Sequence, residues 1–106
     1  MFLQIRKYEL KSGTLDPVVK KAADDFNPIL RRIPGFVDYL IVDCGHGKVL
    51  SVSIFKDKKG VEEADRKSLE WNRKNAEAQL PGPPEVFGGE VLFEGRESQD
   101  LMKAAS

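Results

Sequence analysis

Cysteine, histidine and tryptophan are scarce in this chain of 106 residues, which holds one of each. Cys44 has no second cysteine with which to form an internal disulfide. Cys44 and the sole histidine, His46, also fall short of the roughly four ligands that a structural zinc site needs. Both residues lie beside glycines in a predicted turn, which favours a role in the turn over one in catalysis. We therefore expect neither a metal site nor a disulfide framework.

Excess charge of one sign and long apolar runs are also missing. Seventeen basic and seventeen acidic residues cancel to a net charge of zero, and no basic block stands apart, so we expect no nucleic acid or membrane surface as a partner. No apolar run approaches the roughly 20 residues of a membrane-spanning helix. Arg6 places a charge too early for the apolar core of a signal peptide. The sequence therefore predicts a cytoplasmic protein.

Apolar periodicity and turn residues predict six elements in one domain. Strands are expected over residues 2–10, 36–43, 48–55 and 86–94, and helices over residues 16–32 and 61–79. Pro28 should kink the first helix or restart it with Asn27 as a cap, and because the apolar stripe continues across Pro28 we expect one bent helix that begins at Asp16 and Pro17. Gly88-Gly89 should mark a bulge or a close backbone approach. This order predicts an α+β, ferredoxin-like βαββαβ fold, with two helices on one face of an antiparallel four-stranded sheet. The domain should span residues 1–95, followed by a mobile tail over residues 96–106.

Apolar residues occupy both faces of the predicted central hairpin. One parity carries Phe36, Leu40, Val42, Leu50, Val52 and Ile54, and the other carries Val37, Tyr39, Ile41, Val49 and Phe55. Two helices cover only one face of such a sheet, so a second copy of the sheet is the simplest cover for the other. The pattern predicts a homodimer packed sheet to sheet. The alternative is a solvated face with a few ordinary apolar residues.

The second predicted helix has a charged side and an unusual inner side. The charged side carries Glu62, Glu63, Arg66, Lys67, Glu70, Arg73, Lys74 and Glu77, and it contains the four-residue pairs Glu63–Lys67 and Glu70–Lys74. The opposite side carries Val61, Ala64, Ser68, Leu69, Trp71, Asn72, Asn75, Ala76 and Gln79. Buried amides need hydrogen-bond partners, which favours a polar-lined pocket between this helix and the sheet. The alternative is that Trp71 is a core aromatic and the amides lie at the rim.

Several short motifs together resemble a known family. They are Arg6-x-Tyr8 in the first strand, Pro34-Gly35-Phe36 before the hairpin, the strand Leu50 to Phe55, the helix with Trp71, and the closing Gly89-Glu90-Val91. In their order and spacing over about residues 2–94 they resemble the antibiotic biosynthesis monooxygenase-like family of dimeric α/β barrels. The resemblance implies a barrel formed by two packed sheets and a pocket between helices and sheet in each protomer.

The resemblance also implies a chemistry. Relatives include monooxygenases that oxidise quinol-like or polyphenolic molecules without metal or flavin, so we expect no cofactor. In those enzymes the deprotonated substrate gives its electrons to dioxygen, and the protein supplies an apolar pocket with a few polar groups. The candidates here for binding a small aromatic ligand are Trp71, Asn72, Asn75, Ser68, Arg6, Tyr8 and Tyr39. None of them is a persuasive general base, and no catalytic residue is assigned.

Two other functions remain to be compared with this one. Haem-degrading relatives carry an iron-ligating histidine on the second helix and an asparagine on the first strand. Here the second helix has no histidine, and the first strand offers Gln4 and Arg6, so haem is doubtful. The alternative to a monooxygenase is a noncatalytic protein of the same fold that binds a small molecule or a partner.

Overall fold

The computed structural model describes residues 1–11, 13–75 and 84–96, with the side chain of Asn75 outside this set. Its elements are β1 (Phe2–Glu9), α1 (Leu15–Lys21), the π-helix η1 (Ala22–Phe26), α2 (Asn27–Arg31), β2 (Phe36–Gly45), β3 (Lys48–Phe55), α3 (Lys58–Asn75) and β4 (Glu85–Glu90). Because α1, η1 and α2 follow one another without a break, the predicted βαββαβ order is confirmed.

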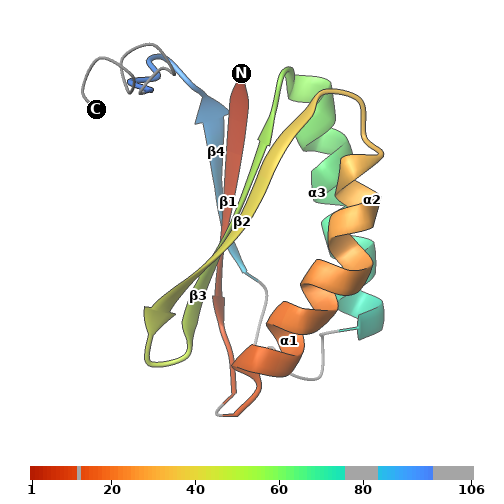
Figure 1. Cartoon of the computed structure of the whole chain (residues 1–106), viewed down its shortest axis with the longest axis vertical. Coiled ribbons are helices and arrows are strands. Elements are labelled where there is room, and N and C mark those ends of the chain that lie inside the picture. The colour runs from red at the N-terminus through yellow and green to blue at the C-terminus, as the bar shows by residue number, and fades with distance from the viewer. Residues whose placement is uncertain (12, 76–83, 97–106) are drawn as a thin grey trace, which may run out of the picture.

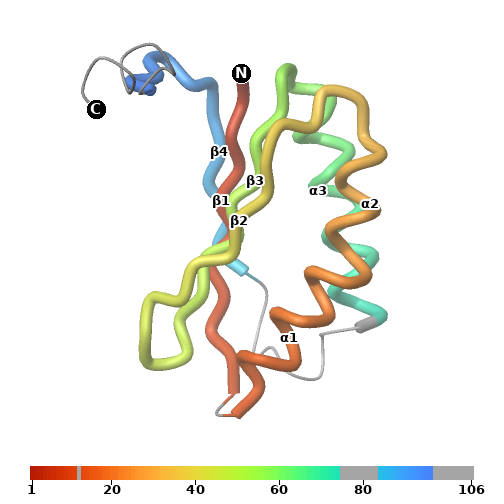
Figure 2. Tube along the Cα trace, in the orientation of Figure 1, coloured from red at the N-terminus to blue at the C-terminus, as the bar shows by residue number. Residues whose placement is uncertain are grey.

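The four strands form one antiparallel sheet in the order β2-β3-β1-β4. Figure 1 shows α1, α2 and α3 together on one side of this sheet, with the other side uncovered. Figure 2 shows the turn between β2 and β3 curving away from the helices. This is the ferredoxin-like α+β arrangement that the sequence predicts. In the described part of the chain, no helix combines the length and the apolar character that crossing a membrane requires.

The first helical segment passes from a π-helix into a new stretch of α-helix at Asn27, just before its proline. Pro28 has no backbone N–H, so the regular bond four residues back is missing there. The ladder widens just before it, where the Asn27 N–H reaches the Ala22 carbonyl five residues back. The start of this helix differs from the prediction: it begins at Leu15, because the Thr14 carbonyl already accepts the Val18 N–H at 3.1 Å. Asp16 therefore lies in the first turn.

The start of α3 is also earlier than predicted. The helix begins at Lys58 rather than at Val61, because Asp57 acts as its cap: the Asp57 Oδ1 accepts the Gly60 N–H at 3.1 Å. Gly60 is buried in the first turn, and a Cβ placed there would lie 2.6 Å from Cδ1 of Phe55. Only glycine allows this helix to approach β3 so closely. The predicted end at Gln79 lies outside the described residues.

A bulge in β2 changes the face assigned to Phe36. Phe36 pairs with Phe55, but after a register shift Leu40 pairs with Val52 and Val42 with Leu50. Phe36 therefore shares the helix side with Phe55, and their rings meet edge to face at 5.8 Å. Grouping Phe36 with Leu40 and Val42 was wrong, because simple alternation does not hold across a bulge.

The last strand is shorter than predicted. β4 ends at Glu90 rather than at residue 94, because its partner β1 is exhausted: the Val91 N–H donates to the Met1 carbonyl at 2.8 Å. Gly88 makes the close backbone approach that was one expectation, since a Cβ there would lie 3.2 Å from the Leu3 carbonyl oxygen. The pairing of β1 with β4 is in continuous register, so the alternative of a bulge is wrong. Residues 97–106 of the predicted tail lie outside the described residues.

The hydrophobic core lies between the helices and the sheet. Its buried cluster consists of Ala22, Phe26, Leu30, Ile33, Phe55, Ala64 and Trp71. η1 contributes Ala22 and Phe26 to this cluster and α2 contributes Leu30, at the helical spacing that the periodicity predicts, while α1 has no buried residue. The core therefore lies between η1, α2, α3 and the sheet, whereas the buried side chains of β1 are the polar Gln4 and Arg6.

Candidate functional site

The inner face of β1 is polar where a strand facing a core is usually apolar. Gln4 and Arg6 point to the helix side and are 9% and 3% exposed. The register places Ser53 of β3 beside Gln4 and Ser51 beside Arg6. Buried polar side chains are rare unless they find partners. The layer between β1 and α3 is therefore built for hydrogen bonding as well as for packing.

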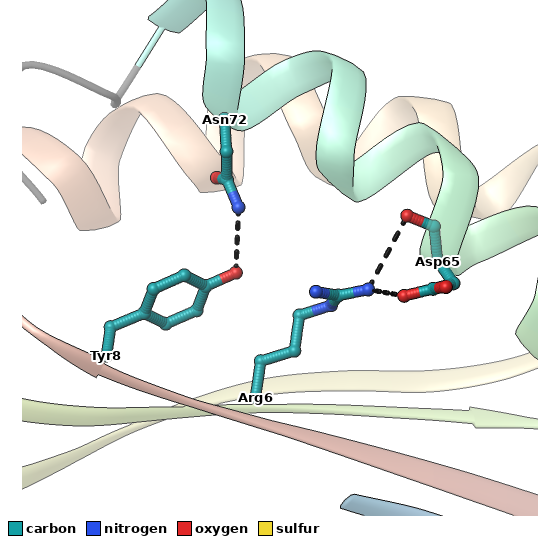
Figure 3. A network of polar contacts seen from close by, with 4 residues as sticks. All are labelled: Arg6, Tyr8, Asp65 and Asn72. Atoms are coloured by element: carbon teal, nitrogen blue, oxygen red, sulfur yellow. Dashed lines mark hydrogen bonds and ion pairs between the residues drawn. The ribbon is translucent and has the colours of Figure 1, made fainter. Parts of the chain in front are cut away.

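Arg6 crosses this layer to α3. Its Nη2 forms an ion pair with the Asp65 carboxylate and also lies 3.5 Å from the Asp65 carbonyl oxygen (Figure 3). The Arg6 side chain is 4% exposed and that of Asp65 is 44% exposed. The Arg6 Nε is buried and has no hydrogen-bond partner among the described residues. Asp65 compensates the charge of the Arg6 guanidinium, while the Arg6 Nε–H remains a buried donor without a partner among the described residues.

A second polar contact joins β1 to α3 about two turns further along the helix. The Asn72 side-chain amide donates to the Tyr8 hydroxyl at 3.0 Å, and Figure 3 shows the two side chains meeting between strand and helix. The predicted need of the Asn72 amide for a partner is thus met by a phenol. A neutral bond of this kind contributes only about 1 kcal/mol, so a ligand could displace it at little cost.

Tyr39 is the other phenol on this side of the sheet. Burial is the main cause that raises its pKa above the ordinary value, with a further contribution from the nearby Tyr8, while the charge of Arg6 acts in the opposite direction. Its ring lies edge to face with that of Phe26 at 5.8 Å. The Tyr39 hydroxyl therefore stays protonated near neutral pH, where it can donate a hydrogen bond but cannot serve as a base.

A cavity of about 50 Å³ lies among these groups. Its polar lining comes from Tyr8, Tyr39, Ser51, Ser68 and Asn72, and its apolar lining from Leu10, Val18, Val19, Ala22, Phe26, Ile41, Val49 and Trp71. We call it the inner cavity. A dry apolar cavity needs about 150 Å³ to hold benzene. An aromatic ligand would therefore have to displace lining side chains, for example by opening the contact between Tyr8 and Asn72.

The inner cavity brings together most of the side chains proposed from the sequence. Tyr8, Tyr39, Ser68, Trp71 and Asn72 all line it. Arg6 lies in the same polar layer but is not among the lining residues. The side chain of Asn75, the last residue of α3, lies outside the described set. Leu69, which was assigned to the inner side of the helix, is 53% exposed, because its position on the helix turns it away from the sheet.

Trp71 satisfies both interpretations that the sequence left open. It is 9% exposed and belongs to the buried core cluster, with its ring 5.2 Å from that of Phe26. It also forms part of the wall of the inner cavity. Trp71 is thus both a core aromatic and part of the cavity wall.

Sequence reasoning missed Asp65, Ser51 and Ser53 of this layer. Asp65 was placed on neither side of the helix, although it lies three residues before Ser68 and seven before Asn72 and so shares their face. Ser51 was noted only as part of a strand. The position of Ser51 beside Arg6 follows from the register of β1 and β3, and the sequence of the hairpin alone does not reveal that register. Helical spacing from Ser68 was therefore the usable signal for Asp65.

The hairpin tip holds no comparable site. Cys44 is exposed, and His46 is exposed with a φ of 55° between two glycines of positive φ. His46 thus lies in the turn, as predicted, and Cys44 flanks the turn near the end of β2. Within residues 1–11, 13–75 and 84–96, no group of three or more histidine, cysteine, aspartate or glutamate side chains is placed to hold a metal ion.

Comparisons with known proteins agree on the fold. No protein-family model and no curated protein sequence matches this chain. Among solved structures, a monooxygenase from Streptomyces coelicolor in complex with nanaomycin D is 17% identical, with 92% of each chain covered and a TM-score of 0.74. A protein of unknown function from Nitrosomonas europaea is also 17% identical, covering 92% of this chain and 94% of that one, with a TM-score of 0.74.

A third similar structure is that of a MhuD variant with two manganese protoporphyrin IX molecules bound per active site. It is 14% identical, covering 92% of this chain and all of that one, with a TM-score of 0.71. The resemblance to the antibiotic biosynthesis monooxygenase-like family is thus confirmed at the level of the fold.

Haem does not fit the residues of this chain. α3 contains no histidine, and the only histidine of the sequence lies at the hairpin tip, away from the helices. Cysteine and tyrosine are the other common axial ligands besides methionine, and the two tyrosines that line the inner cavity are already engaged: Tyr8 accepts a hydrogen bond from Asn72, and Tyr39 is held protonated by burial. The structure therefore supports the doubt about haem binding that the sequence raised.

Proposed function

We propose that this protein binds a small hydroxylated aromatic molecule in the inner cavity of each protomer and oxidises it with dioxygen, without a cofactor. The observation that carries the proposal is the polar lining of an otherwise apolar cavity between α3 and the sheet. A few placed polar groups in an apolar pocket are typical of small-molecule sites. The S. coelicolor monooxygenase of similar fold, in complex with nanaomycin D, supports a ligand of the quinol-like or polyphenolic class.

The chain's own residues would stabilise an anion. The protonated Tyr39 hydroxyl and the side chains of Ser51, Ser68 and Asn72 are the donors that line the cavity. Such donors, fixed by the fold, favour the phenolate form of a bound ring over the neutral form. The ring then supplies the electrons: one oxygen atom of dioxygen enters the ring to give a quinone, and the other leaves as water with the two hydrogens that the ring loses.

The main alternative is a noncatalytic protein that binds the same class of ligand. One observation favours it: no carboxylate or imidazole is found among the described residues that line the inner cavity. The substrate would therefore have to arrive already ionised, which limits catalysis to rings of low pKa. Oxygen consumption separates the two proposals.

The experiment measures oxygen uptake with a panel of hydroxylated naphthalenes and anthracenes. We expect uptake by the native protein and a loss of roughly tenfold or more in Asn72→Ala and Trp71→Phe, because removing a donor or a wall from such a site costs on that order. Asn75→Ala tests a further residue of α3 that was proposed from the sequence. Leu69→Ala, on the exposed side of α3, is the matched control. Uptake that survives the cavity variants unchanged would show that the site is elsewhere. Ligand binding without any uptake would favour the noncatalytic alternative.

We further propose that the protein is a cytoplasmic homodimer packed through the open face of its sheet. On this face Leu40, Val42 and Phe87 are 45%, 42% and 58% exposed. They surround the half-buried side chains of Leu3, Ile5, Leu50, Val52 and Ile54. Contiguous apolar surface of this kind on an uncovered sheet supports an interface between two copies.

A further inference from the structure

A second and larger hollow lies between α2 and α3. It has a volume of about 580 Å³, within the range of about 300 to 1,000 Å³ that small-molecule sites occupy. We call it the outer groove. Its apolar part comes from Ile29, Ile33 and Pro34, with Trp71 as the wall that it shares with the inner cavity. The outer groove is therefore distinct from the inner cavity, and Trp71 lies between them.

The rim of the outer groove carries both signs of charge. Arg32, Lys67 and Lys74 contribute the cations, and Glu63 and Glu70 the anions. Both glutamates face Arg66, which does not line the groove: Arg66 Nη2 donates to Glu63 Oε1 at 2.5 Å, and its Nη1 lies 3.7 Å from Glu70 Oε1. The hydrogen bond from Arg66 also keeps the pKa of Glu63 below its ordinary value.

This arrangement corrects the ion pairs expected from the sequence. Glu63 pairs with Arg66 rather than with Lys67, and Glu70 lies nearest to Arg66 rather than to Lys74. The planar guanidinium can serve two carboxylates at once, which a lysine does less well. In the described part of the chain, Arg32, Lys67 and Lys74 therefore form no ion pair. Four cations and two anions leave a local charge of +2 on a chain whose net charge is zero.

We propose that the outer groove binds a small amphipathic anion, with an aromatic or alkyl body and one carboxylate, sulfonate or phosphate group. The body would lie against Ile29, Ile33 and the edge of Trp71, and the anionic group would meet Lys67 and Lys74 or Arg32. Cations that form no ion pair with the described residues, beside an apolar floor, match such a ligand in charge and in polarity. This site is independent of the function proposed for the inner cavity.

Calorimetric titration with naphthalene-2-sulfonate tests the proposal, with 2-naphthalenemethanol as its neutral counterpart. We expect the double variant Lys67→Gln, Lys74→Gln to weaken sulfonate binding by about tenfold, the combined effect of two charge contacts near the surface. The neutral compound should bind the native protein and the variant within about twofold. Lys59→Gln, an exposed lysine of α3 outside the groove, is the matched control.

Three outcomes would overturn the proposal. Sulfonate binding that is unchanged in the double variant would remove the role of the two lysines. If Lys59→Gln weakened sulfonate binding equally, the effect would come from the overall charge of the protein and not from the groove. Weakening by Asn72→Ala but not by the lysine changes would place the probe in the inner cavity, which would support the proposed function while removing the outer site. All of these substitutions lie at exposed or partly exposed positions, and thermal unfolding monitors that the variants fold.

Discussion

Arg6 brings a positive charge into the layer between β1 and α3, where only Asp65 compensates it among the described residues. Removing one partner of a buried pair leaves the other charge without compensation, which costs about 3 to 5 kcal/mol when both are buried. Asp65 is 44% exposed, so solvent screening reduces this figure. We expect Asp65→Ala to lower the free energy of unfolding in urea by about 1 to 3 kcal/mol.

The control is Glu62→Ala, an exposed glutamate on the same helix. A second variant separates charge from packing: Arg6→Met in the Asp65→Ala background should restore part of the loss, because it removes the uncompensated cation. If Asp65→Ala and Glu62→Ala destabilise the protein equally, the ion pair contributes nothing to the fold.

Tyr39 stabilises the folded protein by an amount that is lost at alkaline pH. Burial raises the pKa of its phenol above the ordinary value, so the folded state holds this proton more tightly than the unfolded state. Stability from this source is fully present below the unfolded pKa of about 10. It is then lost as pH rises from there toward the folded pKa, by up to about 1.4 kcal/mol per pH unit.

The measurement is urea unfolding between neutral pH and strongly alkaline pH, for the native protein and for Tyr39→Phe. Above pH 10 the free energy of unfolding should fall more steeply with pH for the native protein than for the variant. The difference in slope should correspond to about one proton. Parallel curves would show that the phenol is not held protonated by the fold.

Part of the lining of the inner cavity could be predicted from single residues of the sequence. Ser68, Trp71 and Asn72 were identifiable because helical spacing places them on one face, and buried amides need partners. The partner of Asn72 was not identifiable, because Tyr8 is 64 residues away and the contact depends on how β1 and α3 pack. The small volume of the cavity was equally hidden, since it follows from side-chain packing rather than from composition.

At the scale of elements, patterns predicted the existence of each helix and strand, and local backbone geometry decided where each begins and ends. The irregularity of the helix at Pro28 was predictable because it depends on one missing donor. The early start of α3 was not, because it depends on the cap from Asp57 together with the contact of Gly60 with Phe55. The bulge in β2 likewise moved Phe36 to the other face without a sequence signal.

The approach of α3 to β3 gives a prediction at this scale. Gly60→Ala adds a Cβ that would lie within 3 Å of three Phe55 side-chain atoms. Overpacking of this kind costs about 1 to 3 kcal/mol, and the better helix propensity of alanine returns about 1 kcal/mol. We expect a net loss of up to about 2 kcal/mol in the free energy of thermal unfolding.

Lys59→Ala is the control for this change, since the neighbouring position is exposed and alanine there should be neutral or slightly stabilising. The double variant Gly60→Ala, Phe55→Leu distinguishes a clash from a backbone effect, because a smaller partner should relieve part of the cost of the added methyl. Gly60→Ala that stabilises the protein as Lys59→Ala does would mean that α3 does not rest on Phe55.

For the whole molecule, the open face of the sheet predicts association. Leu40→Glu places a charge on the edge strand β2 within the proposed interface, where it would be desolvated in a dimer but remains half exposed in a protomer. Sedimentation velocity should therefore show a dimer for the native protein and a shift toward monomer for Leu40→Glu. Leu69→Glu, at an equally exposed leucine on α3, should leave the dimer intact. A native protein that stays monomeric at micromolar concentration would remove the proposed interface.

The inner cavity is central to both proposed functions, and one measurement tests it most directly. It is an NMR titration of the ¹⁵N-labelled protein with 1,4-dihydroxynaphthalene in the absence of oxygen, so that the ligand binds without turnover. We predict that the largest shifts occur at Ser51, Ser68 and the Asn72 side-chain amide, which line the inner cavity and not the outer groove. Shifts confined to the open sheet face or to Lys67 and Ile33 of the outer groove, or none at all, would contradict it.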